Sequence, residues 1–399
     1  MIDFLKEAEE IKETLREYRR HFHRYPETSG REVKTAEFIS EKLKACGLVV
    51  KEGVGAPLPG VIGCLKGGKA GPAGPTVALR ADMDALFIDE AKDLPYRSVN
   101  PGIMHACGHD CHMAIQLGAA LILKKYRDEL KGNVKFIFQP SEEMNGGAQP
   151  MIDDGALEDP PADAVLALHV DSSFQTGEIG ISYGETMAAS DRLRIYVRGK
   201  SCHGAYPHQG VDAILIAAQI LLAIQTLMAR EKDTFHPAIL SFGMIEGGKS
   251  PNIVCEEVLL RGMCRTLNPE TREALMKRLE EICQGVARSM GGSCEVVREI
   301  SYESLINDDG ITNLIRQAAE SLGGLSLRQL PRARMITEDF AYFAKAVPGA
   351  MWFLGTANRE KDTEWPLHSS HFDVDEDALV IGAALQAAAA WRYLEGHQG

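Results

Sequence analysis

The chain has 399 residues, which are too many for one ordinary hydrophobic core and predict two domains. Its hydrophobic content of 45% and charged content of 25% are typical of a soluble globular enzyme. Acidic residues outnumber basic ones by 56 to 43, and the net charge of −13 argues against nucleic acid as a partner.

The nine cysteines are scattered and odd in number, unlike the dense, even framework of a small secreted domain, and they predict a reducing cytoplasm. Residues 1–10 are charged and lack the apolar core of a signal peptide. The longest apolar stretch, Ala213 to Ala229, is interrupted by polar residues and has the minimum length of a membrane helix. We predict a buried helix there and no membrane partner.

Helix-like and strand-like segments alternate from the N-terminus, which is typical of a mainly parallel sheet covered by helices. The expected helices cover residues 2–25 and 113–126, and the expected strands cover 76–81, 134–138 and 164–168. Residues 53–75 are rich in Gly and Pro, so we predict a surface loop over that stretch.

Between residues 188 and 300 the order of the elements changes to βαββαβ, which is that of a ferredoxin-like domain. The elements are a strand around 193–197, a helix at 211–230, strands at 238–246 and 254–264, a helix at 269–289 and a strand at 293–300. The first pattern resumes with a helix at 311–322, a strand at 351–354 and a terminal helix from Asp375. We therefore predict an α/β fold with a discontinuous catalytic domain, residues 1–187 and 301–399, and an inserted domain, residues 188–300.

Two short segments concentrate side chains that bind transition metals. Residues 104–112 read Met-His-Ala-Cys-Gly-His-Asp-Cys-His, and the segment after a predicted strand ends in the adjacent pair Glu142-Glu143. Thiolate, neutral imidazole and carboxylate are the groups that bind divalent transition metals. The two segments together predict a hydrolytic metal centre.

The positions of the polar residues strengthen this prediction, because open α/β sheets bind ligands beyond the carboxyl ends of their strands. Asp82 and Asp84 follow one predicted strand, the glutamate pair follows a second, His169 ends a third, and His368 follows a fourth. We expect these groups to converge with the 107–109 segment at one edge of the sheet. Five or six such ligands are what a two-metal site requires.

Each of these features also has a structural interpretation. An isolated cysteine is most often a small buried hydrophobe, but Cys107 has three histidines nearby. Adjacent glutamates are usually solvated, but this pair lies between a very apolar strand and Asn145-Gly-Gly. His169 alone fits a core histidine equally well, and His371 could fill the position proposed for His368.

Seven motifs that occur in order along the chain are typical of one enzyme family. They are LRADMDAL at 79–86, MHACGHD at 104–110, FQPSEE at 138–143, LHV at 168–170, GKSCHGAYPH at 199–208, EDF at 338–340 and LHS at 367–369. With these motifs the chain resembles the M20 metallopeptidase family, specifically its amidohydrolase branch. That branch includes aminoacylase-like, hippurate-hydrolase-like and auxin-conjugate-hydrolase-like enzymes, and the resemblance covers essentially the whole chain.

The resemblance implies two divalent metal ions per chain, which Cys107 bridges, and Glu142 as the catalytic base. The remaining metal ligands that it implies are His109, Glu143, His169 and His368. Zinc or manganese is the expected metal, and cobalt and nickel also fit this ligand set.

The chain departs from the patterns of the family in a few places. Many M20 peptidases carry His-x-Asp where this chain has Asp82-Met-Asp84, so His109 is expected to supply the missing imidazole and Asp84 to orient a ligand. Phe87, Cys111 and His371 also differ from the residues that are usual in the branch. None of these changes removes an implied ligand, so they concern specificity more than activity.

Three residues of the inserted domain complete the expected site. His203 is expected to stabilise the oxyanion of the tetrahedral intermediate. Asn252 and Arg265 are the candidates for binding the free carboxylate of an N-acyl amino acid. The resemblance also implies a homodimer through the inserted domain, in which His203 serves the active site of its own chain or that of the partner.

The expected function is metal-dependent hydrolysis of the amide bond in N-acyl amino acids, with acetyl, benzoyl or other aryl-acyl groups. A dipeptidase or carboxypeptidase of the same family is the alternative within this class. A cysteine hydrolase that uses Cys107 is a second alternative, although the two glutamates would then have no role. A metal-dependent binding protein without turnover is a third, although such a protein has no need of Glu142.

Overall fold

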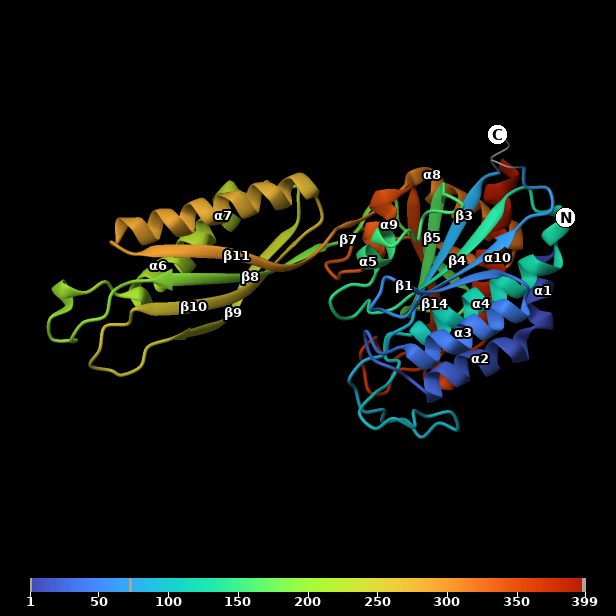
Figure 1. The fold of residues 1–399 in the computed structure, drawn as a ribbon, viewed down its shortest axis with the longest axis horizontal. Helices are drawn as coiled ribbons and strands as arrows, with labels where there is room; N and C mark the ends of the chain where they lie inside the picture. Colours follow the sequence, from blue (N-terminus) through green and yellow to red (C-terminus); the bar gives the residue numbers. More distant parts are fainter. Residues whose placement is uncertain (1, 72–73, 397–399) are drawn as a thin grey trace. The chain divides into compact units, whose positions relative to one another are not determined.

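The structure is a computed structural model that describes residues 2–71 and 74–396, and these residues form two compact units. The larger unit takes its described residues from Met1–Gly184, Ile306–Arg332 and Asp339–Gly399. The smaller unit consists of Glu185–Leu305 and Ala333–Glu338 (Figure 1). The sequence patterns did not predict that residues 333–338 return to the smaller unit.

An eight-stranded sheet runs through the larger unit in the order β1-β2-β4-β3-β5-β14-β6-β13. The strands are β1 (Val49–Val54), β2 (Gly60–Lys66), β3 (Thr76–Asp82), β4 (Asn133–Gln139), β5 (Ala164–Gln175), β6 (Glu178–Ile181), β13 (Ser326–Gln329) and β14 (Gly349–Ala357). The central strands β4, β3, β5 and β14 are parallel to their neighbours within this group. Every residue of β3, β4 and β14 is buried, as expected for strands that are covered on both faces. The prediction of an α/β fold with a mainly parallel sheet is confirmed.

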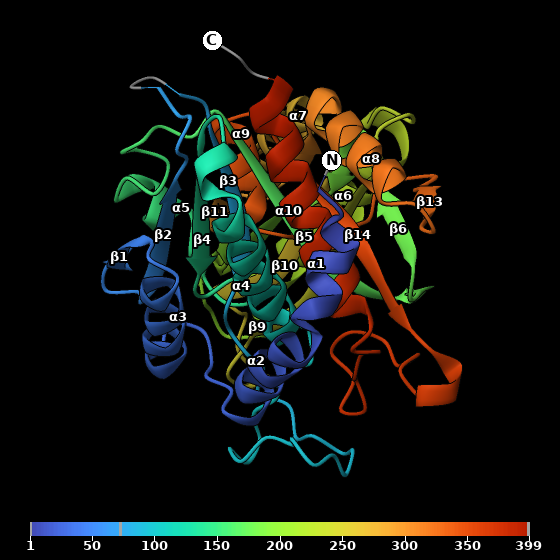
Figure 2. The same ribbon diagram turned by 90° about the vertical axis from the view of Figure 1, so that its right-hand side faces the viewer.

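Helices cover both faces of this sheet. On one face lie α1 (Phe4–Glu10), α2 (Lys12–Arg24), α3 (Val33–Ala45), α4 (His109–Lys125), α8 (Asp309–Leu322) and α10 (Ala378–Gly396), which share one hydrophobic core (Figure 2). The short helices α5 (Ala148–Asp153) and α9 (Phe340–Ala346) lie outside that core and contact each other. Most residues of α4 and α10 are buried, because these two helices pack between the sheet and the outer helices.

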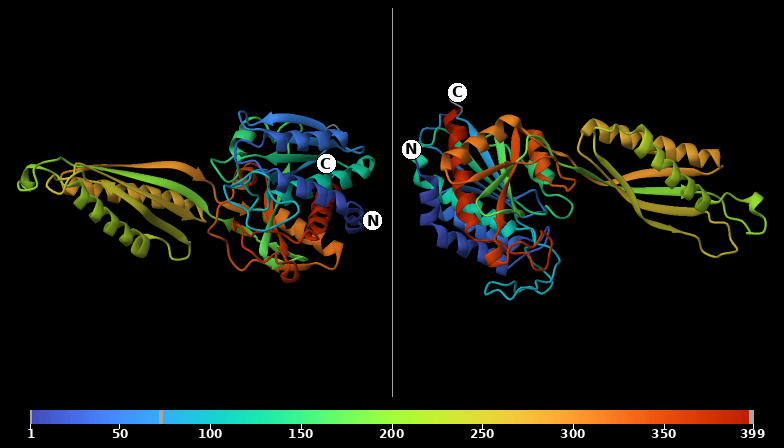
Figure 3. Two further views of the ribbon diagram at one scale, coloured as in Figure 1. Left: turned by 90° about the horizontal axis from the view of Figure 1, so that it is seen from below. Right: turned by 180° about the vertical axis from the view of Figure 1, so that it is seen from behind.

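The smaller unit has the predicted βαββαβ order. Its elements are β8 (Ala189–Arg198), α6 (Ala213–Thr226), β9 (Ala238–Gly247), β10 (Glu257–Thr266), α7 (Pro269–Ser289) and β11 (Ser293–Tyr302). The strands form an antiparallel sheet in the order β11-β8-β10-β9, and both helices pack on the same face (Figure 3). The short strands β7 (Gly184–Met187) and β12 (Leu305–Asn307) pair separately.

The apolar helix α6 is buried on one face only, which corrects the prediction of a buried helix. Ile216 and Ile220 lie in the core of the smaller unit, whereas Leu215 and Leu222 are 52% and 66% exposed. By length and composition alone, the stretch Ala213–Glu231 could cross a membrane, and it is the one helix of this kind among the described residues.

The prediction of a surface loop over residues 53–75 is wrong for Gly60–Lys66. This segment is strand β2, which pairs with β1 on one side and β4 on the other. The glycines reflect close packing rather than a loop, because a Cβ at Gly60 would lie 2.4 Å from the carbonyl oxygen of Val54.

Candidate metal centre

The five residues that the resemblance implied as metal ligands lie together in the larger unit. They are Cys107, before α4; His109, the first residue of α4; Glu143, after β4; His169, within β5; and His368, in the segment after β14. His169 was predicted to end its strand, but β5 continues to Gln175 because its later residues still pair with β14. All five positions face the same end of the central strands, as the open-sheet argument expects.

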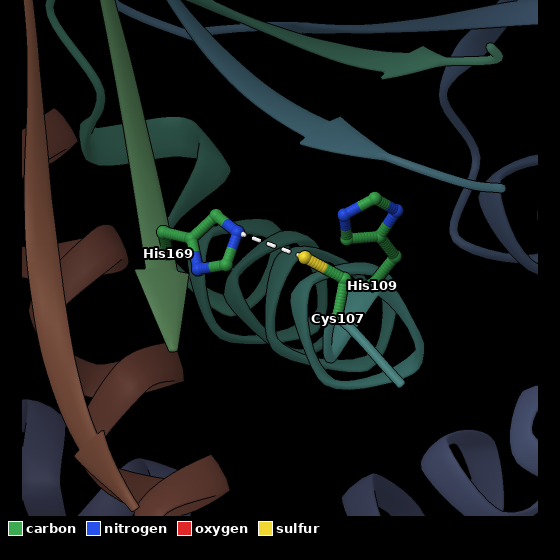
Figure 4. A group of neighbouring side chains, drawn as sticks. All are labelled: Cys107, His109 and His169. Atoms are coloured by element: carbon green, nitrogen blue, oxygen red, sulfur yellow. Dashed lines mark hydrogen bonds between the residues drawn. The ribbon is translucent and has the colours of Figure 1, made fainter. Parts of the chain in front are cut away.

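The thiol of Cys107 is at the centre of this group. Its Sγ lies 3.6 Å from Nε2 of His169 and 3.3 Å from Nε2 of His368. Oε1 of Glu143 lies 3.3 Å from Nε2 of His368 and 3.9 Å from Nε2 of His109. Figure 4 shows the imidazoles of His169 and His109 on opposite sides of Cys107. Thiol, imidazole and carboxylate groups, all of which can bind a metal, thus converge within a few ångströms.

Backbone carbonyls fix the orientation of two of these histidines. Nδ1 of His109 lies 2.8 Å from the carbonyl oxygen of Asp84, and Nδ1 of His169 lies 2.7 Å from that of Val170. Because a carbonyl oxygen can only accept, each Nδ1 donates, and in the neutral ring Nε2 carries the lone pair. Metal-bound histidines show this same arrangement, in which the second nitrogen donates to a carbonyl or carboxylate.

Among the buried nitrogens that have no hydrogen-bond partner within the described residues, one belongs to an implied metal ligand. Nε2 of His109 is in this state, although the residue is only 1% exposed. Buried polar atoms are nearly always paired, so an unpaired nitrogen within a group of thiol, imidazole and carboxylate calls for a ligand. The donor set and this nitrogen fit a divalent transition metal.

The electrostatics of the site also favour a cation. Burial raises the pKa of Cys107 well above its usual value, and Glu143 and Glu142 add to this effect. Burial opposes protonation of His109, but Asp82 and Asp84 outweigh it and raise the pKa of His109 to about 10. Cys107 and His109 therefore hold their protons because negative charge surrounds them. A metal ion would displace such protons when it binds these ligands.

His112 is close to this group, but both of its ring nitrogens are already bonded. Its Nε2 accepts a hydrogen bond from the N–H of Val170 at 2.9 Å, so Nδ1 donates to Oδ1 of Asp82 at 2.6 Å. Burial lowers the pKa of His112 to about 4, which agrees with a neutral ring. Arg80 donates to the other oxygen of Asp82 at 2.7 Å. His112 and Asp82 thus form a supporting pair rather than a ligand pair.

The adjacent glutamates occupy different positions. Glu143 lies between His109 and His368, as described above, whereas Glu142 is 9% exposed and its Oε1 accepts from the N–H of Asp339 at 3.4 Å. Oxygen atoms of both glutamates lie within 4.8 Å of a nitrogen of His109. Glu142 is therefore next to the ligand group without being central to it.

Asp84 holds the backbone of both glutamates. Its Oδ1 accepts from the N–H of Glu142 at 3.1 Å, and its Oδ2 accepts from the N–H of Glu143 at 3.0 Å. Oδ2 also accepts from the hydroxyl of Ser29 at 2.6 Å. These bonds, together with the carbonyl bond to His109, connect Asp84 to two of the implied ligands.

Two residues of the site have a left-handed backbone conformation. Ser141 has φ +61° and His368 has φ +64°. Each such conformation costs a non-glycine residue on the order of 1–3 kcal/mol and persists only where neighbouring contacts hold it. The N–H of His368 donates to the carbonyl oxygen of Ala106 at 2.8 Å, which fixes His368 next to the Cys107 segment.

His371, the alternative to His368, lies outside the ligand group. Its ring stacks on Trp365, with 4.7 Å between ring centroids, and its Nδ1 lies 3.2 Å from the hydroxyl of Ser370. The sequence left the choice between the two histidines open, and the structure brings His368 to Cys107.

The three candidates from the inserted domain all belong to the smaller unit. His203 and Asn252 are exposed and lie on adjacent segments, since His203 forms a β-bridge with Ile253. Arg265 is half-buried, and its Nη1 donates to the carbonyl oxygen of Met335 at 2.8 Å. Burial lowers the pKa of Arg265.

Sequence reasoning missed two buried carboxylates that contact the glutamate loop. Glu32 accepts from the N–H of Ser141 at 2.8 Å, and Asp339 accepts from the N–H groups of Gly147 and Ala148 at 2.9 and 3.0 Å. Burial raises the pKa of Glu32 to about 8. Asp339 belongs to the EDF motif, which could have identified it, whereas Glu32 follows no strand and belongs to no motif that we recognised.

Comparison with known proteins places these observations in a family. The model of the peptidase family M20/M25/M40 matches residues 78–392. The N-acetyl-L-cysteine deacetylase of Bacillus subtilis is 38% identical over 95% of this chain and 88% of its own length. Thermostable carboxypeptidase 1 of Saccharolobus solfataricus is 37% identical over 98% and 99%. The crystal structure of a dinuclear metal binding peptidase from the M20 family of Bacillus subtilis superposes with a TM-score of 0.84 at 31% identity, over 97% and 99% of the two chains.

Proposed function

The chain belongs to the peptidase family M20/M25/M40, and we propose that within this family it hydrolyses N-acyl amino acids to a carboxylic acid and a free amino acid. As a member of the family it is a metal-dependent hydrolase that acts on amide bonds. The observation that carries the proposal is the group of five side chains that could hold a metal, with Glu142 beside it. The similarity to the N-acetyl-L-cysteine deacetylase supports an N-acyl substrate.

For the cofactor we propose two divalent ions per chain, with zinc or manganese preferred over cobalt or nickel. Cys107 would bridge them, and the other ligands would be His109, Glu143, His169 and His368. The relative from Bacillus subtilis that is described as a dinuclear metal binding peptidase supports the number of ions. When bound, such ions polarise the scissile carbonyl and make water more acidic.

We assign the proton transfers to Glu142. Its carboxylate accepts a proton from the attacking water and delivers it to the nitrogen of the leaving amine, so that the products are a carboxylic acid and a free amine. General acid–base transfer of this kind typically accelerates a reaction by about 10²–10⁴. The near-complete burial of Glu142 and its place beside His109 support this role. The hydrogen bond that Asp84 accepts from the N–H of Glu142 holds the backbone that carries this carboxylate.

For the smaller unit we propose that His203 stabilises the oxyanion and that Asn252 binds the free carboxylate of the substrate. Their exposure and their proximity through the His203–Ile253 bridge support a joint role. Arg265 was assigned to the same carboxylate, and its bond to the carbonyl of Met335 competes with that task. Asn252 is therefore the better supported of the two.

We also propose a homodimer that forms through the smaller unit. Strand β9 is at the edge of its sheet, and Ile245 on this strand is 57% exposed. Leu222 on α6 adds a second exposed apolar side chain, and such edges and faces favour association.

A reducing cytoplasm is the proposed location, because all nine cysteines lie among the described residues and are free.

A hydrolysis panel tests the proposed substrate class. The enzyme would be reconstituted with each of the four metals and assayed on N-acetyl, benzoyl, indoleacetyl and p-aminobenzoyl amino acids and on dipeptides. We expect an N-acyl amino acid to give the highest kcat/KM. A dipeptide in first place would replace the proposal by the peptidase alternative, which the similarity to the thermostable carboxypeptidase supports.

Chelation distinguishes the metal mechanism from a cysteine hydrolase. We expect a chelator to abolish activity, and brief alkylation of the metal-loaded enzyme to leave it unchanged. Full activity after complete metal removal would favour Cys107 as a nucleophile. If the metal-loaded protein hydrolysed no substrate of the panel, that result would favour a binding function instead.

A further inference from the structure

The loop after β4 carries both glutamates of the site and has an irregular backbone. It extends over residues 141–148, and Ser141, Asn145 and Gly146 have φ values of +61°, +70° and +74°. A segment with several left-handed residues cannot form a strand or a helix. Its backbone N–H groups therefore need hydrogen-bond acceptors from other segments. Its amide groups find these partners in side-chain carboxylates.

Three carboxylates accept five backbone N–H groups of this loop. Glu32 accepts from residue 141, Asp84 from residues 142 and 143, and Asp339 from residues 147 and 148. We call Glu32, Asp84 and Asp339 the carboxylate cradle. All three are at most 1% exposed, and they come from segments before α3, after β3 and before α9. Hydrogen bonds that buried carboxyl oxygens accept from backbone N–H groups are directional, so the cradle fixes the loop at both ends and in the middle.

Glu32 differs from the other two members of the cradle. Arg80 donates to Asp339 at 2.8 Å, and Ser29 donates to Asp84, so both of those carboxylates have side-chain donors. Oε2 of Glu32 is buried and has no hydrogen-bond partner among the described residues. An unpaired buried carboxylate oxygen is unfavourable for folding, so the stability of the fold does not account for a glutamate at this position.

We propose that Glu32 is a positioning residue of the hydrolytic reaction. Its Oε1 holds the amide of Ser141, which keeps this residue in its left-handed conformation and thereby sets the direction of the next side chain, Glu142. The inference rests on the proposed role of Glu142 as the base. A proton carrier must lie within hydrogen-bond reach of the water and of the leaving nitrogen, so a small rotation of the loop reduces turnover.

Two substitutions separate the reach of Glu32 from its acidic group. Glu32→Asp keeps the carboxyl group but withdraws it by one methylene group, whereas Glu32→Gln removes the titratable group but keeps the length and an acceptor oxygen. We expect Glu32→Asp to lower kcat by about 10–100-fold, with KM and metal content close to wild type, because a displacement near 1 Å can cost this much. Glu32→Gln should stay within about 3-fold of wild type. Glu32→Leu, which fills similar space without an acceptor, should reproduce the loss and serves if the aspartate variant does not fold.

Glu27 provides a matched control. It also precedes α3, and its carboxylate accepts from the N–H and hydroxyl of Thr35, both at 2.9 Å, rather than from the loop. Glu27→Asp makes the same chemical change and should leave kcat unchanged. Hydrogen exchange of the peptide that covers residues 139–150, measured in metal-free protein, should be faster in Glu32→Asp than in Glu27→Asp or wild type.

A double-mutant cycle tests whether Glu32 acts through Glu142. In the Glu142→Gln background the base is absent, so Glu32→Asp should lower the residual kcat by less than about 3-fold. Equal losses of kcat in both backgrounds would show that Glu32 acts elsewhere. A wild-type kcat for Glu32→Asp would overturn the inference. So would a Glu32→Gln variant whose kcat is as low as that of Glu32→Asp. If Glu142→Gln itself kept full activity, the proposed base would be wrong whatever Glu32 does.

Discussion

Arg19 on α2 connects the two chain segments that carry Cys107, His109 and His368. It is completely buried, and its Nε donates to Asp110 at 2.9 Å and its Nη2 to Asp373 at 2.7 Å. Asp110 is the residue after His109, and Asp373 lies five residues after His368. We predict that Arg19→Met, which keeps most of the length but removes the charge, strongly destabilises the larger unit.

The magnitude follows from the burial of the partners. Asp110 is 0% and Asp373 5% exposed, so the substitution removes the guanidinium that these two buried carboxylates share. Removing one partner of a buried ion pair typically costs about 3–5 kcal/mol. Arg16 is the control, because its side chain is 26% exposed and pairs with Glu13 and Asp377 at the surface. Arg16→Met should cost about 1 kcal/mol or less.

The cost of Arg19→Met should depend on pH. Burial acts to raise the pKa of Asp110, but Arg19 and His23 outweigh it and hold this pKa well below its usual range. A carboxyl with a depressed pKa stabilises the fold above its unfolded pKa of about 3.9 and loses this contribution as the pH falls through the folded value. Without Arg19 the folded pKa of Asp110 rises. The variant is then most destabilised near neutral pH, and the deficit shrinks as the pH falls through this raised pKa.

Tryptophan fluorescence during urea unfolding of metal-free protein is the assay. The three tryptophans, Trp352, Trp365 and Trp391, all belong to the larger unit, so their signal reports on that unit alone. Unfolding curves at a series of pH values from 7.5 downward would be compared for both variants and wild type. The reasoning is refuted if Arg19→Met costs no more than Arg16→Met at pH 7.5, or if its cost does not fall as the pH is lowered.

Three further predictions concern the site itself. Cys107→Ala should lose metal and activity together, and full metal content in this variant by elemental analysis would rule out a bridging thiolate. Glu142→Gln should keep both ions and lower kcat by about 10² or more, whereas Glu143→Gln should weaken metal binding; the opposite pattern would exchange their roles. If His203 serves the partner's site, His203→Ala and Glu142→Gln homodimers should each be nearly inactive but regain activity as purified mixed dimers. Mixed dimers as inactive as the parents would place His203 at the site of its own chain or outside catalysis.

The parts of the fold that depend on local pattern could be predicted from the sequence. Strands β3 and β4 contain short apolar runs at residues 77–79 and 136–138, and the helix α7 covers the predicted residues 269–289. Strand β2 could not be recognised, because Gly60 and Gly63 are required by tight packing against other segments and not by a turn. Strand β1 was also missed, since most of its residues are exposed at the edge of the sheet and its sequence, VVKEGV, does not alternate between apolar and polar residues.

The site was predictable where residue type and strand position agree, as they do for Asp84 and for the pair Glu142-Glu143. The left-handed conformations of Ser141 and His368 could not be predicted, because they depend on hydrogen bonds to segments far away in the chain. Glu32 was missed for the same reason, since its partner is 109 residues away. Long-range hydrogen bonds leave no periodic signal in a sequence.

The connectivity of the larger unit has a consequence for its synthesis. Strand β5 is complete at residue 175, but its partner β14 begins at residue 349, and the late segment also supplies His368 and α10. At about 5–20 residues per second, the apolar edge of β5 waits roughly 10–35 s on the ribosome for its neighbour. All four strands of the smaller unit's sheet have by then been translated. We therefore expect the smaller unit to fold first, and the unpaired edge of β5 to be the surface of the nascent chain that most needs a chaperone.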